Sequence, residues 1–106
     1  MSLAKSLGVD ALTEAGAKVS KDVKICNRRG LHARASAKFA KESSAFDARI
    51  EVCKDDTCVV GTSIMGLMML GAARGEIINI AASGPDADEA LTNLCSLVED
   101  MFGEGE

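Results

Sequence analysis

The sequence predicts an α+β fold of two layers. It is an open-faced β-sandwich in the order β-α-β-β-α-β-α, with three helices on one face of a four-stranded antiparallel sheet. Residues 46–53 alternate apolar and polar side chains, as a half-buried strand does. Residues 91–101 place apolar side chains at helical spacing. Along the chain, the spacing of apolar residues alternates between the two-residue period of strands and the longer period of helices, as in helices packed on a sheet. The length of 106 residues fits one domain.

The first half of the chain predicts a strand, a helix and a β-hairpin. Val23–Asn27 is a short strand candidate. A helix is expected over His32–Lys41, where apolar side chains follow at four-residue spacing at Leu31, Ala35 and Phe39. The strand of residues 46–53, with Phe46, Ala48, Ile50 and Val52 on one face, then turns at Lys54–Thr57. Its expected partner is the strand Cys58–Gly61.

The second half predicts two more helices and a strand. A short helix is expected over the apolar run Ile64–Leu70, because the hydroxyl of Thr62 or Ser63 can cap it. Glu76–Ala82 is the fourth strand candidate. Asp86 with Glu89 resembles a capping box for a last helix, whose apolar face would be Leu91, Leu94, Val98 and Met101.

Composition and charge exclude several classes of function. The formal net charge is −4, there is no Trp or Tyr, and only three Phe occur. The basic surface and aromatic sheet face of a small nucleic-acid-binding domain, the competing interpretation from another class, are therefore missing. No long apolar span or signal-peptide pattern occurs, so we expect a cytoplasmic protein without membrane insertion. Residues 1–20 predict a flexible N-terminal leader, ahead of a domain over residues 21–106.

The four cysteines are Cys26, Cys53, Cys58 and Cys95, and they form no CxxC motif. No Cys–His pair with the spacing of zinc ligands occurs either. Cys53 and Cys58 can face each other across the predicted hairpin, so a disulfide or metal site there is the alternative. Because disulfides are rare inside the cell, we expect four small, partly buried thiols and no metal site.

The only histidine, His32, lies where the first predicted strand gives way to a helix. Backbone N–H groups such as that of Ala33, together with the positive end of the helix dipole, favour an anion at this point. A neutral imidazole nitrogen is a nucleophile, and these N–H groups can bind the oxygens of a phosphoryl group once it is attached. Arg34 can add a guanidinium, and Gly30 lets the backbone turn close to the site. By position alone, however, such a histidine is more often a cap or a surface residue.

Two sequence blocks resemble a known family, and this resemblance favours a functional role for His32 over that of a simple cap or surface residue. Residues 27–39, NRRGLHARASAKF, closely resemble the active-site region of HPr, the histidine-containing phosphocarrier of the phosphoenolpyruvate-dependent phosphotransferase system. Residues 63–70, SIMGLMML, resemble the second-helix signature of the same family. The separation of the two blocks and the predicted element order agree with that family as well. The resemblance covers residues 21 to 103.

The resemblance implies a phosphoryl relay. His32 would accept a phosphoryl group through Nδ1 from the phosphorylated first enzyme of the system, and would pass it to a downstream sugar-specific or nitrogen-branch acceptor. Arg34 would stabilise the phosphoryl group, with support from Gly30 and the backbone at Ala33. Such a protein needs no cofactor and turns nothing over by itself, and the family favours a monomer.

The same resemblance assigns roles to the second block. Ser63 matches a regulatory serine that a dedicated kinase phosphorylates in some bacteria, and it can also be a simple helix N-cap. Ile64, Met65 and Met68 match an apolar partner-binding surface, and methionine suits a surface that accepts several partners. Leu67 and Leu70 are expected in the core.

The chain departs from the family pattern at two positions. Ala35 stands where the family usually has proline, which would preorganise the first helical turn. Arg29 adds positive charge before Gly30. The Ala-Ser-Ala sequence at 35–37 is similar to alphaproteobacterial members of a nitrogen-related, regulatory branch. The alternative function is therefore a purely regulatory protein of that branch, which would signal by its phosphorylation state through partner binding.

Overall fold

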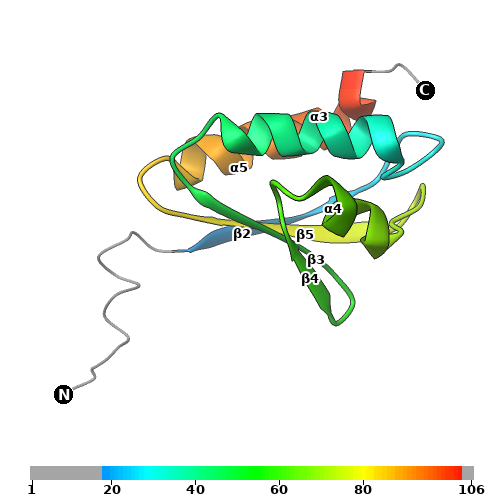
Figure 1. Ribbon diagram of the computed structural model, residues 1–106, viewed down its shortest axis with the longest axis horizontal. Coiled ribbons are helices and arrows are strands. Elements are labelled where there is room, and N and C mark those ends of the chain that lie inside the picture. The colour runs from blue at the N-terminus through cyan, green and yellow to red at the C-terminus, as the bar shows by residue number, and fades with distance from the viewer. Residues whose placement is uncertain (1–17, 104–106) are drawn as a thin grey trace.

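The computed structural model describes residues 18–103, which form one sheet and the helices packed on it (Figure 1). In chain order the elements are β2 (Val19–Lys24), α3 (Ala33–Ser44), β3 (Arg49–Lys54), β4 (Thr57–Val60), α4 (Ile64–Leu70), β5 (Ile77–Ser83), α5 (Ala87–Glu99) and the 3₁₀ turn η1 (Met101–Gly103). This order confirms the predicted β-α-β-β-α-β-α pattern. Residues 1–17 of the expected leader lie outside the described residues.

The four strands are antiparallel neighbours in the order β2-β5-β3-β4. β5 lies between β2 and β3, so strands distant in the sequence pair in the centre of the sheet, with Val23 opposite Ile78 and Val52 opposite Ile80. Successive residues of a strand point to opposite faces, and Ile78, Ile80 and Ala82 all belong to the core cluster. Helices α3 and α5 lie side by side on that face in Figure 1.

The core is built mainly from aliphatic side chains. Its largest fully buried apolar members are Phe39, Phe102, Ile25, Leu67, Ile78, Ile80, Leu94, Val52 and Val98. In a domain this small each of them matters, because removal of a buried aromatic or leucine side chain costs several kcal/mol, on the order of 2–5. Leu67 and Leu70 lie in this core, as expected.

Two predicted strand boundaries were wrong. β2 runs from Val19 to Lys24 rather than from Val23 to Asn27, because its pairing with β5 begins at Val19, opposite Ala82. Ile25 N, one residue past the strand, continues the same register by donating to Glu76 O at 2.9 Å. β3 begins at Arg49 rather than at Phe46. The backbone N–H of Asp47 donates to Asp86 Oδ2 at 2.8 Å and is therefore not available to the sheet.

The same contact shows that the predicted capping box was wrong. Asp86 is the N-cap residue of α5, but its side chain makes no cap hydrogen bond because it is bonded to Asp47. The last helix is also shorter than its apolar stripe suggested. α5 ends at Glu99, and Met101 and Phe102 have left-handed backbone conformations that turn Phe102 into the core.

The expectation of four free thiols was wrong. Cys53 and Cys58 form a disulfide, because the register of β3 and β4 places them directly opposite each other with Cα atoms 4.0 Å apart. Cys26 and Cys95 are free. Burial raises the pKa of the Cys95 thiol, since it disfavours the thiolate. None of the described helices has the length and apolar character needed to span a bilayer.

Candidate functional site

His32 is the N-cap residue of α3, at the point where the sequence predicted the helix to begin. Its backbone is extended, and its carbonyl accepts the first helical hydrogen bond from Ser36 N at 2.8 Å. Its ring also takes part in capping, because Nδ1 accepts a hydrogen bond from Arg34 N at 3.3 Å. The imidazole therefore has one nitrogen lone pair turned toward the positive end of the helix.

The turn before His32 is held from both sides. Gly30 has φ +64°, a left-handed conformation that favours glycine. The buried side chain of Asn27 donates to Gly30 O at 2.9 Å, and Leu31 N donates to Ala72 O at 3.0 Å. A Cβ atom at Gly30 would overlap the carbonyl oxygen of Ala72. Glycine is thus required here both by conformation and by space.

The loop of residues 71–76 supports this turn, and sequence reasoning missed it. Gly75 N donates to Ile25 O at 2.8 Å, and Glu76 O accepts from Ile25 N. The Glu76 carboxylate accepts from Ala73 N at 2.8 Å and pairs with Lys54 at 3.0 Å. These contacts, the Ala73 hydrogen bond first, hold the pKa of Glu76 below its usual range. No local sequence signal connects this loop to His32, because the contacts are tertiary.

Two groups that follow His32 in the chain have no hydrogen-bond or ion-pair partner among residues 18–103. The Arg34 side chain is exposed, and its guanidinium makes no hydrogen bond or ion pair with another described residue. The N–H of Ala33 likewise has no acceptor within residues 18–103. Because both donors belong to the two residues that directly follow His32, they are candidates to bind an anion at the start of α3.

Ser63 is the N-cap residue of α4, one of the two caps the sequence allowed. Its hydroxyl accepts from Gly66 N at 3.0 Å and its carbonyl accepts from Leu67 N at 3.0 Å. The helix ends at Leu70, and the left-handed residue Gly71 follows it. Lys54 Nζ donates to the carbonyl of Leu70 at 3.4 Å, so the cation of the loop-supporting ion pair also stabilises the end of α4.

One side of α4 exposes large apolar side chains. Ile64, Met65 and Met68 are 43%, 73% and 44% exposed, as expected for a surface patch rather than a core stripe. Met69, which the sequence analysis did not single out, is 78% exposed and extends the patch. α4 packs against α3, but no hydrogen bond or ion pair joins Ser63 to the His32 turn among the described residues.

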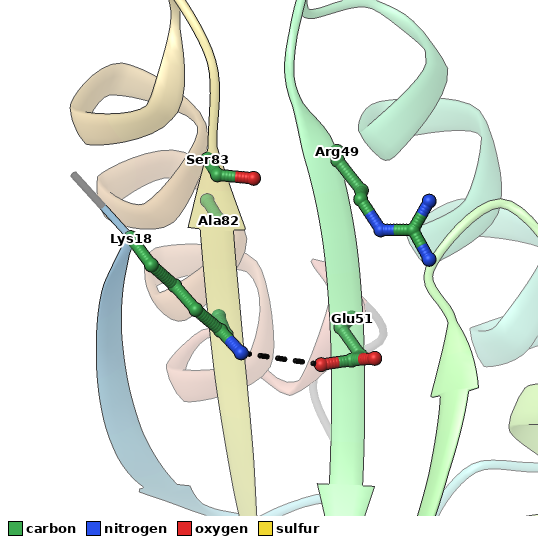
Figure 2. A pocket seen from close by; sticks show the side chains of 6 residues that line it. Lys18, Arg49, Glu51, Ala82 and Ser83 are labelled. Carbon is green, nitrogen blue, oxygen red and sulfur yellow. Dashed lines mark hydrogen bonds and ion pairs between the residues drawn. The ribbon is translucent and has the colours of Figure 1, made fainter. Parts of the chain in front are cut away.

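A hollow of ≈ 190 Å³ lies on the sheet, away from this site (Figure 2). Lys18, Arg49, Glu51 and Ser83 contribute polar side chains to it, and Lys18 reaches across β5 to Glu51 at 3.5 Å. No residue of the His32 turn lines it. His32 itself is half-buried, and Ala33 and Arg34 after it are exposed.

A family model described as the phosphorylation site of the HPr component of the phosphotransferase system matches residues 19–100. The chain belongs to the HPr family. It is 47% identical over 88 residues to the phosphocarrier protein HPr of Neisseria meningitidis serogroup A, covering 83% of this chain and 99% of that one. It is 41% identical over 87 residues to the phosphocarrier protein NPr of Shewanella violacea, covering 82% and 96%.

Solved HPr structures have the same fold. The crystal structure of HPr from Thermoanaerobacter tengcongensis superposes with a TM-score of 0.78 at 41% sequence identity, over 81% of this chain and 97% of that chain. Membership of the HPr family makes this protein a phosphocarrier of the phosphotransferase system that interacts with the enzymes of that system. The purely regulatory alternative is not favoured.

Proposed function

We propose that His32 is the phosphoryl acceptor and that Nδ1 is the atom that carries the group. The single observation behind this proposal is the position of Nδ1, which accepts the hydrogen bond of Arg34 N at the start of α3. An atom that accepts a hydrogen bond carries no proton, so Nδ1 has a lone pair. This lone pair is the nucleophile that attacks phosphorus once it turns away from the N–H of Arg34. The P–N bond forms as the bond from phosphorus to the donor enzyme breaks.

The donors around His32 then hold the product. As Nδ1 turns its lone pair to phosphorus, the N–H of Arg34 is released and can donate to a phosphoryl oxygen. The N–H of Ala33 and the Arg34 guanidinium supply further charge-assisted hydrogen bonds. Gly30 keeps the turn in place. The group leaves again when a downstream acceptor attacks the same phosphorus, so positioning and charge neutralisation account for the chemistry.

The donor in this scheme is the first enzyme of the phosphotransferase system, and the downstream acceptor belongs to the sugar-specific or the nitrogen branch. The exposed apolar surface of Ile64, Met65 and Met68 would contact these partners, because methionine side chains adapt to different surfaces. A kinase acting on Ser63 would add negative charge at the start of α4 and weaken binding to an acidic partner. We further propose a cytoplasmic monomer. Its carrier domain begins before the predicted boundary at residue 21, because β2 starts at Val19.

Phosphorylation by the first enzyme tests the acceptor directly. The full chain is incubated with phosphoenolpyruvate and that enzyme, and intact mass is compared with that of His32→Asn and Arg34→Ala. Asn is chosen because it keeps an N-cap side chain at position 32 while removing the nucleophile. One acid-labile phosphoryl group on the parent protein and none on His32→Asn is the expected result.

The Arg34→Ala variant should accept the group more slowly, because it loses a charge-assisted contact. Equal labelling of the parent protein and folded His32→Asn would refute His32 as the acceptor. A parallel incubation with ATP and a serine kinase of this system tests Ser63 separately, with Ser63→Ala as the control. Light scattering of the purified chain measures the oligomeric state.

A further inference from the structure

The open face of the sheet carries a cluster of metal-ligand atoms that phosphoryl transfer does not use. Glu51, Cys53 and Cys58 each offer one ligand atom, and these three atoms lie within 4.8 Å of one another. They come from facing strands: Cys53 is directly opposite Cys58, and Glu51 precedes Cys53 by two residues on β3. Side chains two residues apart on a strand share a face, so Glu51 lies on the same face as Cys53. The disulfide between Cys53 and Cys58 brings the two sulfur atoms together in this structure.

The cluster is accessible to ions and small reagents. Cys58 is exposed, whereas Cys53 and Glu51 are half-buried. The neighbouring residues Val52 and Val59 pack against the core on the other face of the sheet, and this packing holds the β3–β4 hairpin in place. Rigid strands hold ligands better than loops do, so only the side chains need to rearrange to bind an ion.

From this arrangement we propose that Glu51, Cys53 and Cys58 form a redox-gated site for a thiophilic divalent cation such as Zn²⁺. Two thiolates and one carboxylate are a donor set that zinc accepts, and three protein ligands leave a fourth tetrahedral position for water. In the disulfide form, both sulfur atoms are bonded to each other and no thiolate is available. The disulfide is therefore the closed state of the site, and the dithiol is the open state.

The opening reaction is thiol–disulfide exchange with a dithiol reductant. The protein S–S bond breaks, the two cysteines each gain a hydrogen, and the reductant becomes a disulfide. Metal binding then releases the two thiol protons as two metal–sulfur bonds form. Tetrahedral Zn–S bonds of ~2.3 Å place the sulfur atoms about 3.8 Å apart, a separation that side-chain rotation on facing strand positions can provide.

The charges around the cluster permit this binding. Lys18 pairs with Glu51 at 3.5 Å, and Figure 2 shows its side chain lying over the sheet toward that carboxylate. The two side chains are 60% and 35% exposed, so water screens the pair and a divalent cation can displace it. Arg49 lines the neighbouring hollow on the same strand. The site lies on the sheet face opposite the helices and is independent of the function proposed for His32.

Metal titration of the two redox forms tests the proposal. The full chain is freed of metal with a chelator and split into a sample reduced by a phosphine and a sample oxidised by a small disulfide. Thiol counting under denaturing conditions verifies the forms, because the sequence has four cysteines and the disulfide occupies two. Co²⁺ is then titrated without oxygen while thiolate-to-cobalt charge-transfer absorption is followed, and Zn²⁺ is added in competition.

The reduced chain is expected to bind one Co²⁺ with thiolate absorption that Zn²⁺ abolishes, and the oxidised chain to bind none. Cys53→Ser and Cys58→Ser should lose the absorption. Glu51→Gln should weaken binding by about tenfold or more, since even supporting residues of metal sites contribute about that much. Cys26→Ser, which removes a free thiol outside the cluster, should bind as the parent does.

Three results would each overturn the site. One is equal binding by the oxidised and reduced chains, and a second is unchanged binding by folded Cys53→Ser or Cys58→Ser. The third is no thiolate absorption in a reduced chain whose four thiols all react. Phosphorylation of His32 is measured on the same samples, so failure of the metal site and failure of the phosphocarrier assignment are distinguished.

Discussion

Replacement of Gly30 by alanine separates the two reasons for glycine in the turn that holds His32. The first reason is conformation, since φ is +64°. A non-glycine residue there costs roughly 1–2 kcal/mol. The second is space, because the new Cβ would overlap the Ala72 carbonyl oxygen. Moving that carbonyl breaks its hydrogen bond with Leu31 N, which contributes roughly 0.5–1.5 kcal/mol.

Gly30→Ala should therefore lower the free energy of unfolding by roughly 2–3 kcal/mol, or Tm by on the order of 10–20 °C for a domain of this size. Gly71→Ala is the matched control. Gly71 has nearly the same backbone, φ +62°, but its Cβ would meet only Met69 O at 4.0 Å. We expect it to pay the conformational cost of roughly 1–2 kcal/mol alone.

Denaturant unfolding and the initial rate of phosphorylation by the first enzyme check both variants. Gly30→Ala should also be phosphorylated more slowly, because displacement of Leu31 moves His32 and its contact with Arg34 N. Gly71→Ala should retain nearly the parent rate. If the two variants lose equal stability and react at equal rates, the contact with Ala72 does not position the histidine and the reasoning fails.

Three further predictions concern the surroundings of the site. Ser63→Ala should lower the free energy of unfolding by about 1 kcal/mol through loss of the α4 cap, whereas Ser63→Asp should retain it, as measured in urea. The Glu76 carboxylate has a lowered pKa, so its contribution to the free energy of unfolding is fully present above the usual glutamate pKa and is lost as pH falls through the lower folded value. In Glu76→Gln, the free energy of unfolding should therefore depend less on pH in that acidic range. Phe102→Ala should cost about 3–5 kcal/mol, because the ring is fully buried, and a thermal melt against Met101→Ala measures this.

Local periodicity correctly predicted the elements whose form depends on adjacent residues and is not changed by contacts with distant parts of the chain. The apolar run Ile64–Leu70 forms α4 with those bounds, and its division into buried Leu67 and exposed Met65 follows the sequence pattern. His32 caps α3 as expected, because a helix start depends on a few adjacent residues. For these two helices the residues that determine where the helix begins are adjacent in the sequence.

Elsewhere the cause lies in another part of the chain. The carboxylate of Asp86 can cap its own helix or bind a distant N–H, and only the fold brings Asp47 within reach. The support of the histidine turn by Ala72 depends in the same way on a loop far along the sequence. The expectation of free thiols at Cys53 and Cys58 was wrong because it rested on the rarity of disulfides inside the cell, whereas the strand register places the two cysteines directly opposite each other.

The hydrogen bond between Leu31 and Ala72 has a consequence for how the protein is made. A chain emerges from the ribosome N-terminus first, so β2, His32 and α3 are synthesised before the loop that holds the turn. β2 must also wait for β5, its only neighbour among the strands of residues 18–103. Such long-range contacts form late in folding. An unfinished chain therefore carries His32 before the carbonyl that holds its turn has been synthesised. We expect chains that end before Ala72 to be poorer phosphoryl acceptors than the complete chain.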